Sequence, residues 1–239
     1  MKVPIPLYDV LHLDEERMVV RVEPMVTVGD ITRFLVPRGY TLAVTLEIAD
    51  ATLGGLAFGV GMTTYSHKVG LYQETIEEYE VVLGDGSVVC ARGDNEYSDL
   101  YHCLPWSHGS LGFLVSLTLK IIPVKPYIHM KYIPVRGQKE YCDMIRDISG
   151  AGDKDKEVPD YVEATVYNKE EAVIMVGNFA DVKTPEQVRM AFSLDLNDNG
   201  FVSVFRNPRL TMLQDGINPG FTSMLRVSWR RGRVRSTYP

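Results

Sequence analysis

The chain has 239 residues, of which 45% are hydrophobic and 23% are charged, and its formal net charge is −6. This composition is that of a folded globular protein, large enough for one large domain or two small ones. The negative net charge excludes a general attraction to nucleic acid. The sequence has no apolar run of about 18 residues that could span a bilayer, and its start lacks the pattern of a signal peptide.

Two groups of residues depart from this average composition. The last fifteen residues hold five arginines and no acid, namely Arg226, Arg230, Arg231, Arg233 and Arg235. They form either a basic arm that binds phosphate or a membrane surface, or a solvated tail. We favour the solvated tail because the arginines show no aromatic or apolar periodicity. The cysteines, Cys90, Cys103 and Cys142, are odd in number and lack zinc-site spacing. We expect them to be small, buried, reduced thiols.

Alternation and capping residues predict the elements of the first half. Valine-rich alternation over 18–22 predicts a strand. Thr27 can then cap a helix that places Ile31, Phe34 and Leu35 on one face and ends at Pro37. The other signals predict strands over 40–44, 79–83, 87–90 and 113–122, a hairpin turn at 84–86 and a short helix near 99–104.

The pattern changes after Pro126, where a second α+β unit is expected to begin. It predicts a strand over 127–135, a helix over 138–148, and strands over 161–167 and 172–176. A charged loop separates the helix from the last two strands. From about Met190 onward the chain is rich in turn residues, and no element is assigned there.

A glycine-rich stretch between Thr52 and Gly70 is the strongest functional signal. It contains Gly54, Gly55, Gly59, Gly61 and Gly70, interspersed with the hydroxyl side chains of Thr52, Thr63, Thr64 and Ser66. Glycines let a backbone approach a ligand closely, and exposed amides at a helix start bind phosphate oxygens, so the stretch suits a pyrophosphate. The Rossmann and Walker patterns are both absent. Close packing of a helix on a sheet is the competing explanation.

The order of the segments resembles the FAD-binding domain of the p-cresol methylhydroxylase (PCMH) and vanillyl-alcohol oxidase type. In that family a glycine loop precedes a hairpin like Val81-Val82-Leu83-Gly84-Asp85-Gly86, a helix like Ser98-Asp99-Leu100, and a turn like Gly109-Ser110-Leu111-Gly112 that leads into a strand. Further runs resemble the delta-24 sterol reductase, or Diminuto-like, branch. They are Val20–Pro24, Ser66–Leu71, Pro105–Ser107, Ile121–Pro123, Pro134–Gly137 and Glu171–Met175, and the resemblance extends from Val3 to Asp181.

The resemblance implies an α+β fold with a PCMH-type FAD-binding domain over 1–125, the beginning of a substrate or cap domain over 126–189, and an unassigned tail over 190–239. The amides of Gly54 and Gly55 would lie near the pyrophosphate, and Leu111 would pack near the flavin or adenine. The full set of implied cofactor-binding residues is Thr52, Leu53, Gly54, Gly55, Leu56, Ala57, Phe58, Gly59, Val60, Gly61, Met62, Thr63, Thr64, Ser66, His67, Gly70, Gly112, Phe113 and Leu114.

The resemblance also implies the chemistry. In the family, NADPH reduces FAD, and FAD then delivers hydride to the C24=C25 double bond of a desmosterol-like sterol. A flavin suits such a two-electron transfer. Family members act at the endoplasmic reticulum membrane and carry an N-terminal anchor, which this sequence does not contain. An earlier part of the family's FAD domain and most of the substrate domain have no counterpart here, so we expect an incomplete chain that binds FAD weakly or not at all.

Several roles stay open at this point. His67 is as well suited to a structural role as to a cofactor contact, and His102 and His108, which flank Trp106, have no acid partner in the sequence. No general acid and no metal site is identified. Two alternatives remain: another PCMH-type flavin oxidase acting on an alcohol or hydroxy acid, and an inactive chain that serves only as a binding module.

Overall fold

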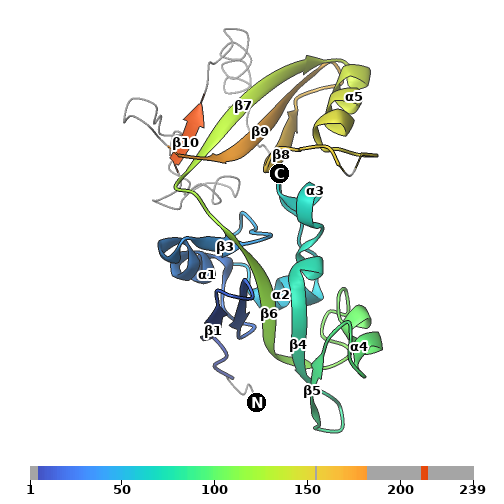
Figure 1. Cartoon of the computed structure of the whole chain (residues 1–239). Coiled ribbons are helices and arrows are strands. Elements are labelled where there is room, and N and C mark those ends of the chain that lie inside the picture. The colour runs from blue at the N-terminus through green and yellow to red at the C-terminus, as the bar shows by residue number, and fades with distance from the viewer. Residues whose placement is uncertain (1–4, 154, 182–210, 215–239) are drawn as a thin grey trace, which may run out of the picture. The chain divides into compact units, whose positions relative to one another are not determined.

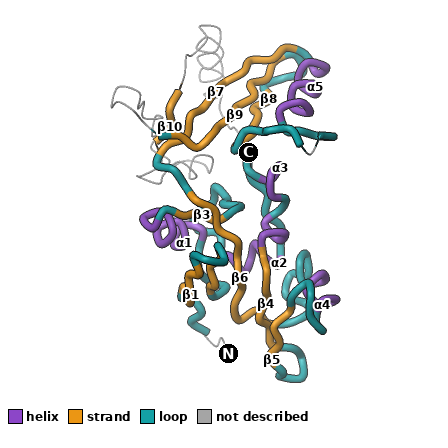
Figure 2. The backbone as a smooth tube through the Cα atoms, viewed as in Figure 1, coloured by secondary structure: helices purple, strands orange, loops and turns teal. Residues whose placement is uncertain are grey.

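The computed structural model describes residues 5–153, 155–181 and 211–214 (Figure 1). Contacts divide the chain into two compact units, with a boundary between Lys125 and Pro126. Each unit contains one β-sheet with helices, as the tube in Figure 2 shows. The arginine-rich segment 226–235 lies outside the described residues.

The first unit is built around one long central strand. Its elements are β1 (Val10–Asp14), β2 (Val19–Val22), α1 (Val28–Leu35), the 3₁₀ helix η1 (Val36–Arg38), β3 (Tyr40–Leu42), α2 (Leu53–Phe58), α3 (Ser66–Val69), the 3₁₀ helix η2 (Tyr72–Thr75), β4 (Ile76–Val82), β5 (Val88–Ala91), α4 (Ser98–Cys103) and β6 (Phe113–Pro123). The sheet order is β1-β2-β6-β4-β5, and β3 also pairs with β6. All these pairings are antiparallel. Strand β6 therefore holds together segments from both ends of the unit.

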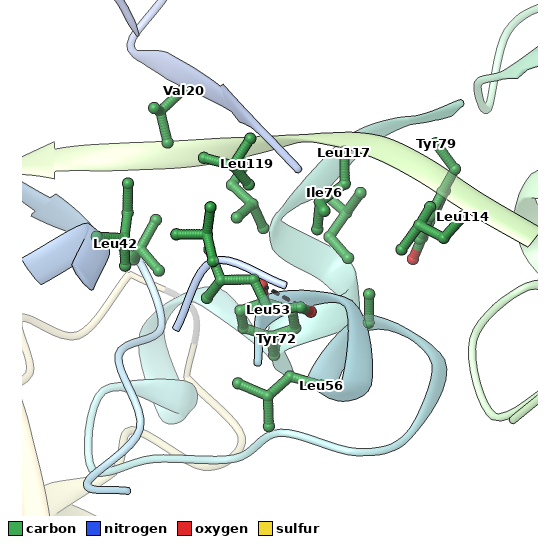
Figure 3. Close-up of a cluster of buried hydrophobic side chains, with 14 of the residues drawn as sticks. Val20, Leu42, Leu53, Leu56, Tyr72, Ile76, Tyr79, Leu114, Leu117 and Leu119 are labelled. Atoms are coloured by element: carbon green, nitrogen blue, oxygen red, sulfur yellow. Dashed lines mark hydrogen bonds between the residues drawn. The ribbon is translucent and has the colours of Figure 1, made fainter. Parts of the chain in front are cut away.

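One face of this sheet carries the hydrophobic core. Leu117, Leu119 and Ile121 alternate along β6 toward this face and are buried, and Leu114 joins the same core beyond an irregularity in the strand register. Helices α1 and α2 contribute further buried side chains to the same cluster. Figure 3 shows Leu117 and Leu119 on the side of β6 that faces α2 and Tyr72. The apolar side chains of β6 therefore form the surface on which helices α1 and α2 pack.

Helix α1 begins at a complete capping box. The Thr27 side chain accepts a hydrogen bond from the Asp30 amide, and the Asp30 carboxylate accepts one from the Thr27 amide. The pKa of Asp30 is lowered, chiefly by the hydrogen bond from the Thr27 side chain. The helix buries Ile31 and Leu35 as expected from the sequence.

The opposite face of the sheet is polar and is crossed by ion pairs. Arg21 of β2 donates to Ser116 Oγ at 3.0 Å and to the Glu80 carboxylate at 2.7 Å, and Ser116 Oγ donates to the same carboxylate at 2.7 Å. Glu78 is paired with Arg92. The hydrogen bond from Ser116 is the main cause that lowers the pKa of Glu80, and Arg21 adds to it. A sheet with one apolar and one polar face is the usual arrangement for antiparallel strands.

In its described residues, the second unit is a smaller sheet with one helix. Its elements are β7 (Tyr127–Arg136), α5 (Gln138–Ile148), β8 (Tyr161–Val166), β9 (Glu171–Ala180) and β10 (Thr211–Gln214), in the sheet order β10-β7-β9-β8. Strand β10 is parallel to β7, and the other pairs are antiparallel. Helix α5 packs through Tyr141, Met144 and Ile145 on Val135 and Ile174.

The sequence missed two features of this fold. Strand β1 was not expected, because the segment before Met18 mixes prolines and charges with apolar residues, yet it pairs with β2 along Val10–Asp14. The expectation of buried thiols was wrong, since Cys90, Cys103 and Cys142 are all exposed. Cys90 lies on the polar face of the sheet, because its neighbours Val89 and Ala91 fill the core.

The network around Glu80 predicts a pH-dependent stability. A carboxylate whose pKa is lower in the folded state stabilises the fold above its unfolded pKa, and this contribution is lost as the pH falls through the folded pKa. We expect Glu80→Gln to lower the free energy of unfolding at pH 7 by about 1 kcal/mol, and by much less near pH 3. Urea unfolding at both pH values measures this. Glu77→Gln is the control, because its partner Arg17 is largely exposed, and equal losses in the two variants would contradict the prediction.

Candidate functional site

Helix α2 lies at the start of the glycine-rich stretch and is capped by Thr52. The Thr52 side chain accepts a hydrogen bond from the Gly55 amide at 3.3 Å, and the helix ends at Gly59, whose amide donates to the Gly55 carbonyl oxygen. The side chain of Leu53 is buried in the core. Gly55 is exposed on the outer side of the helix, where it leaves the backbone uncovered.

The first amides of α2 are used inside the chain. The Leu53 amide donates to the Val26 carbonyl oxygen at 2.9 Å, and the Gly54 amide donates to the Pro24 carbonyl oxygen at 2.8 Å. A Cβ at Gly54 would lie 2.5 Å from the Cβ of Pro24. Gly54 therefore allows close packing of the helix on the chain before α1, as the competing explanation from the sequence proposes. Its amide already has an acceptor and is not available to a ligand.

The backbone after α2 presents different amides. The Gly59 carbonyl oxygen accepts a hydrogen bond from Gln73, and the Gly61 carbonyl oxygen accepts one from the Tyr72 amide at 2.8 Å. The peptide bonds of this stretch are trans, and a trans peptide directs its amide hydrogen away from its carbonyl oxygen. The amides of Val60 and Met62 therefore point away from η2, and within the described part of the chain they have no acceptor.

This run of amides is accessible. The residues Val60 and Met62 are 53% and 68% exposed, whereas Gly61 between them is buried against Tyr72. Neighbouring outward amides form a concave group of donors that binds anions. The stretch from Thr52 to Val69 contains no acidic residue and does contain Lys68. The local charge therefore favours an anion.

Hydroxyl groups continue the site toward α3. The Ser66 Oγ accepts a hydrogen bond from the Thr63 amide at 3.0 Å, and the Ser66 amide donates to the Thr63 carbonyl oxygen at 3.0 Å. These reciprocal bonds fix the turn that carries Thr64. Helix α3 then ends at Gly70, whose φ of +85° requires glycine and whose absent Cβ leaves room for Glu74.

A second segment contacts the end of α2. The His108 amide donates to the Phe58 carbonyl oxygen at 3.1 Å, which joins the turn before β6 to the glycine-rich stretch. Trp106 and His108 have φ values of +67° and +50°, which cost on the order of 1–3 kcal/mol each in residues other than glycine. Trp106 is exposed beside this strained turn. Strain of this kind is concentrated at functional sites.

The candidate residues therefore separate into two groups. Those that are buried in the structure are Leu53, Gly54, Leu56, Ala57, Phe58, Gly61 and Leu114. Those with exposed or partly exposed surface are Thr52, Gly55, Gly59, Val60, Met62, Thr63, Thr64, Ser66, His67, Gly70, Gly112 and Phe113. Along β6 the exposed Phe113 and the buried Leu114 point to opposite faces, because strand side chains alternate. Gly112 packs closely on the Val82 carbonyl oxygen.

Sequence reasoning did not identify Tyr72 and Gln73 as part of this site. The Tyr72 amide and the Gln73 side chain donate hydrogen bonds to carbonyl oxygens of the glycine-rich stretch. Neither residue belongs to a known phosphate-binding motif. In the sequence Gln73 stands beside Glu74 and Thr75, so nothing there indicated that its side chain is buried. Trp106 and His108 were noted, but their strained backbone has no sequence signature.

The residues present fit a pyrophosphate group. Two outward amides, neighbouring hydroxyl groups and the side-chain-free surface of Gly55 supply donors and close access to the backbone, which a phosphate needs. The residues that the structure describes contain no cluster of three or more potential metal-ligating side chains. In the same residues, no helix has the length and apolar character needed to cross a membrane.

Comparison with known proteins bears on this site. Residues 5–92 match a family model described as an FAD binding domain. That range includes β1 to β5 and the whole glycine-rich stretch. The α+β fold with an FAD-binding domain, expected from the sequence, is thereby confirmed.

The chain is also similar to curated proteins along most of its length. It is 45% identical over 180 residues to the Delta(24)-sterol reductase of Pisum sativum, an alignment that covers 73% of this chain and 32% of that protein. The Delta(24)-sterol reductases of Arabidopsis thaliana and Homo sapiens are 46% and 42% identical over 177 and 185 residues, covering 72% and 77% of this chain and 31% and 34% of theirs. The chain thus spans about a third of the length of these relatives, and the resemblance drawn from the sequence is confirmed.

The two adjacent glycines provide a test of these separate roles. Gly54→Ala is expected to lower the free energy of unfolding by about 1–3 kcal/mol, because its Cβ would overlap the backbone of Pro24. Gly55→Ala is expected to change it by no more than about 1 kcal/mol, because its Cβ would meet only the Thr52 hydroxyl, whose displacement costs one N-cap hydrogen bond, and alanine favours a helix. Urea unfolding of both variants decides the matter, and equal losses would refute the division of roles.

Proposed function

We propose that this chain, a homologue of the Delta(24)-sterol reductases with an FAD binding domain, is the FAD-binding part of an FAD-dependent sterol reductase. The single observation that carries the proposal is the outward amide run at Val60 and Met62, within the segment that matches the FAD binding domain. In this proposal the two amides and the Thr64 hydroxyl bind the pyrophosphate of FAD. Gly55 allows the cofactor to approach the backbone.

The reaction we propose is the reduction of the C24=C25 double bond of a desmosterol-like sterol, with NADPH as the hydride source. One hydride and one proton add across the double bond, and NADPH becomes NADP⁺. FAD, when bound, supplies the two-electron transfer between them. The residues of this chain bind and orient the cofactor. No proton donor is assigned.

Localisation and partners follow from the same proposal. A sterol is an almost wholly apolar substrate, so an enzyme that acts on it works at a membrane, and we propose the endoplasmic reticulum membrane for this protein. The partners are then the sterol, FAD and NADPH. The whole glycine-rich set from Thr52 to Gly70, together with Gly112, Phe113 and Leu114, is proposed as the cofactor-binding region, with the buried members supporting its shape.

The first test is cofactor binding by the purified chain. We expect FAD to bind, weakly, with a change in its absorption spectrum, and ADP to compete because it shares the pyrophosphate. Gly55→Asp should weaken binding about tenfold or more, since it places a negative charge beside the phosphates; tenfold corresponds to about 1.4 kcal/mol. Gly84→Asp is the matched control, because Gly84 is exposed in the hairpin turn with open space around it. Equal effects of the two substitutions would overturn the proposed site.

A second test addresses the reaction. With FAD, NADPH and a sterol that has a C24=C25 double bond, we expect a product two hydrogen atoms heavier, detected by mass spectrometry. Oxidation of an alcohol or hydroxy acid instead would favour the related flavin oxidases. Binding of FAD without either turnover would assign this chain a binding role alone.

A further inference from the structure

Gln73 is a polar residue in the interior of the first unit. It lies in η2 and is 6% exposed. Burying a side-chain amide costs free energy unless its groups form hydrogen bonds. Its nitrogen Nε2 donates to two carbonyl oxygens, that of Leu56 at 3.1 Å and that of Gly59 at 2.5 Å. The Gln73 side chain thus links η2 to the last turn of α2.

The two acceptors determine where α2 ends. If the helix continued, the Leu56 carbonyl oxygen would accept a hydrogen bond from the Val60 amide, four residues later. Gln73 occupies that carbonyl instead. It also holds the Gly59 carbonyl oxygen toward η2, so the Val60 amide of the same trans peptide is directed outward. Both hydrogen bonds therefore leave the Val60 amide without an acceptor in the described part of the chain.

The neighbouring residue acts in the same direction. The Tyr72 amide holds the Gly61 carbonyl oxygen at 2.8 Å, and the Tyr72 hydroxyl donates to the Leu53 carbonyl oxygen at 3.3 Å, which is the dashed line in Figure 3. A Cβ at Gly61 would lie 2.6 Å from the Cβ of Tyr72. Tyr72 fixes the position of η2 against α2, and the Gln73 side chain is thereby held in reach of its two acceptors.

We propose that Gln73 is a positioning residue of the candidate site, whose carboxamide keeps the Val60 amide available for a phosphate oxygen. The inference rests on the proposed function, in which the amides of Val60 and Met62 bind the pyrophosphate of FAD. Gln73 itself touches no ligand in this proposal. It acts by ending α2 at Phe58, with Gly59 as the C-cap, and by turning one peptide plane.

The second polar atom of Gln73 makes the proposal testable. Its Oε1 is buried and has no donor among the described residues. In a Gln73→Glu variant, an ionised carboxylate would face two carbonyl oxygens without any donor, so burial would raise its pKa. The neutral acid, in contrast, could donate its proton to one of the two carbonyl oxygens. The variant is therefore expected to regain the native arrangement at low pH.

The experiment measures FAD affinity of the full chain at pH 8 and pH 5.5 by flavin absorbance. Relative to the parent at the same pH, Gln73→Glu is expected to bind about tenfold more weakly at pH 8, and to recover most of the loss at pH 5.5. Gln73→Met cannot donate, so its loss should be the same at both pH values. Gln138→Glu, an exposed glutamine in the second unit, is the charge-matched control and should show no loss.

Other ionisable groups near η2 do not affect the comparison of FAD affinities at the two pH values. The titratable side chains on the packed and adjoining elements are His67 and Lys68 of α3, Tyr72 and Glu74 of η2 itself, and Glu77, Glu78, Tyr79 and Glu80 of β4, whereas α2 has none. All of them are present in the parent and in every variant, so their effect cancels in the ratio of affinities. Gln73→Glu binding as tightly as the parent at pH 8, or an equal loss at both pH values, would overturn the proposal.

A measurement without cofactor separates this proposal from the proposed function. In Gln73→Met the Leu56 carbonyl oxygen is released, so α2 can extend and the Val60 amide can bond to it. We expect the hydrogen exchange of the Val60 amide, followed by NMR, to slow in this variant. A merely structural role would loosen the turn and leave Val60 exchange fast, which would refute the positioning role. If the parent chain failed to bind FAD while Val60 exchange slowed as expected, the proposed function would fail and the positioning role would stand.

Discussion

A trans peptide unit directs its carbonyl oxygen and its amide hydrogen to opposite sides of the chain, and the glycine-rich stretch is organised by this constraint. The Gly59 and Gly61 carbonyl oxygens, which η2 binds on the inner side, leave the amide hydrogens of Val60 and Met62 on the outer side. The inner bonds are fixed because Tyr72 is fully buried among Leu53, Ile76 and the residues of β6. The direction of the amides that would bind an anion is thus set by Tyr72 and Gln73, which the anion itself would not contact.

The glycines of this stretch serve different physical purposes. Gly54 allows the helix to approach Pro24, Gly61 allows the chain to approach Tyr72, and Gly70 adopts a backbone conformation that other residues avoid. Gly55 differs from all three, because its missing side chain faces solvent. A glycine-rich sequence is therefore evidence for both packing and binding at once, and only the direction in which each Cβ would point separates the two.

Much of the fold could be predicted from the sequence, for physical reasons. The helix Gln138–Ile148 begins after a glycine and carries apolar residues at helical spacing, and the strand over Phe113–Pro123 has continuous β-forming residues. The short strand β1 was missed because its pairing with β2, and not its own composition, stabilises it.

The candidate site was predictable in position and not in detail. Glycine density and hydroxyl groups located the stretch, but the acceptors that occupy the amides of Leu53 and Gly54 come from Val26 and Pro24. The donors that free Val60 and Met62 come from Gln73 and Tyr72. Such pairings depend on the packed arrangement of distant segments, which hydrophobic periodicity does not encode.

The central position of β6 has a consequence for how the protein is made. Arg21 of β2 bonds to Ser116 of β6 across 95 residues of chain, and β4 must lie on the other side of the same strand. Closing so long a loop costs entropy before any contact is gained, and folds with such distant pairings form slowly. During synthesis, the first unit stays without its middle strand until the segment up to Pro123 has left the ribosome. Until then the apolar side chains of α1 and α2 lack the β6 residues that cover them, and exposed apolar surface of this kind favours aggregation.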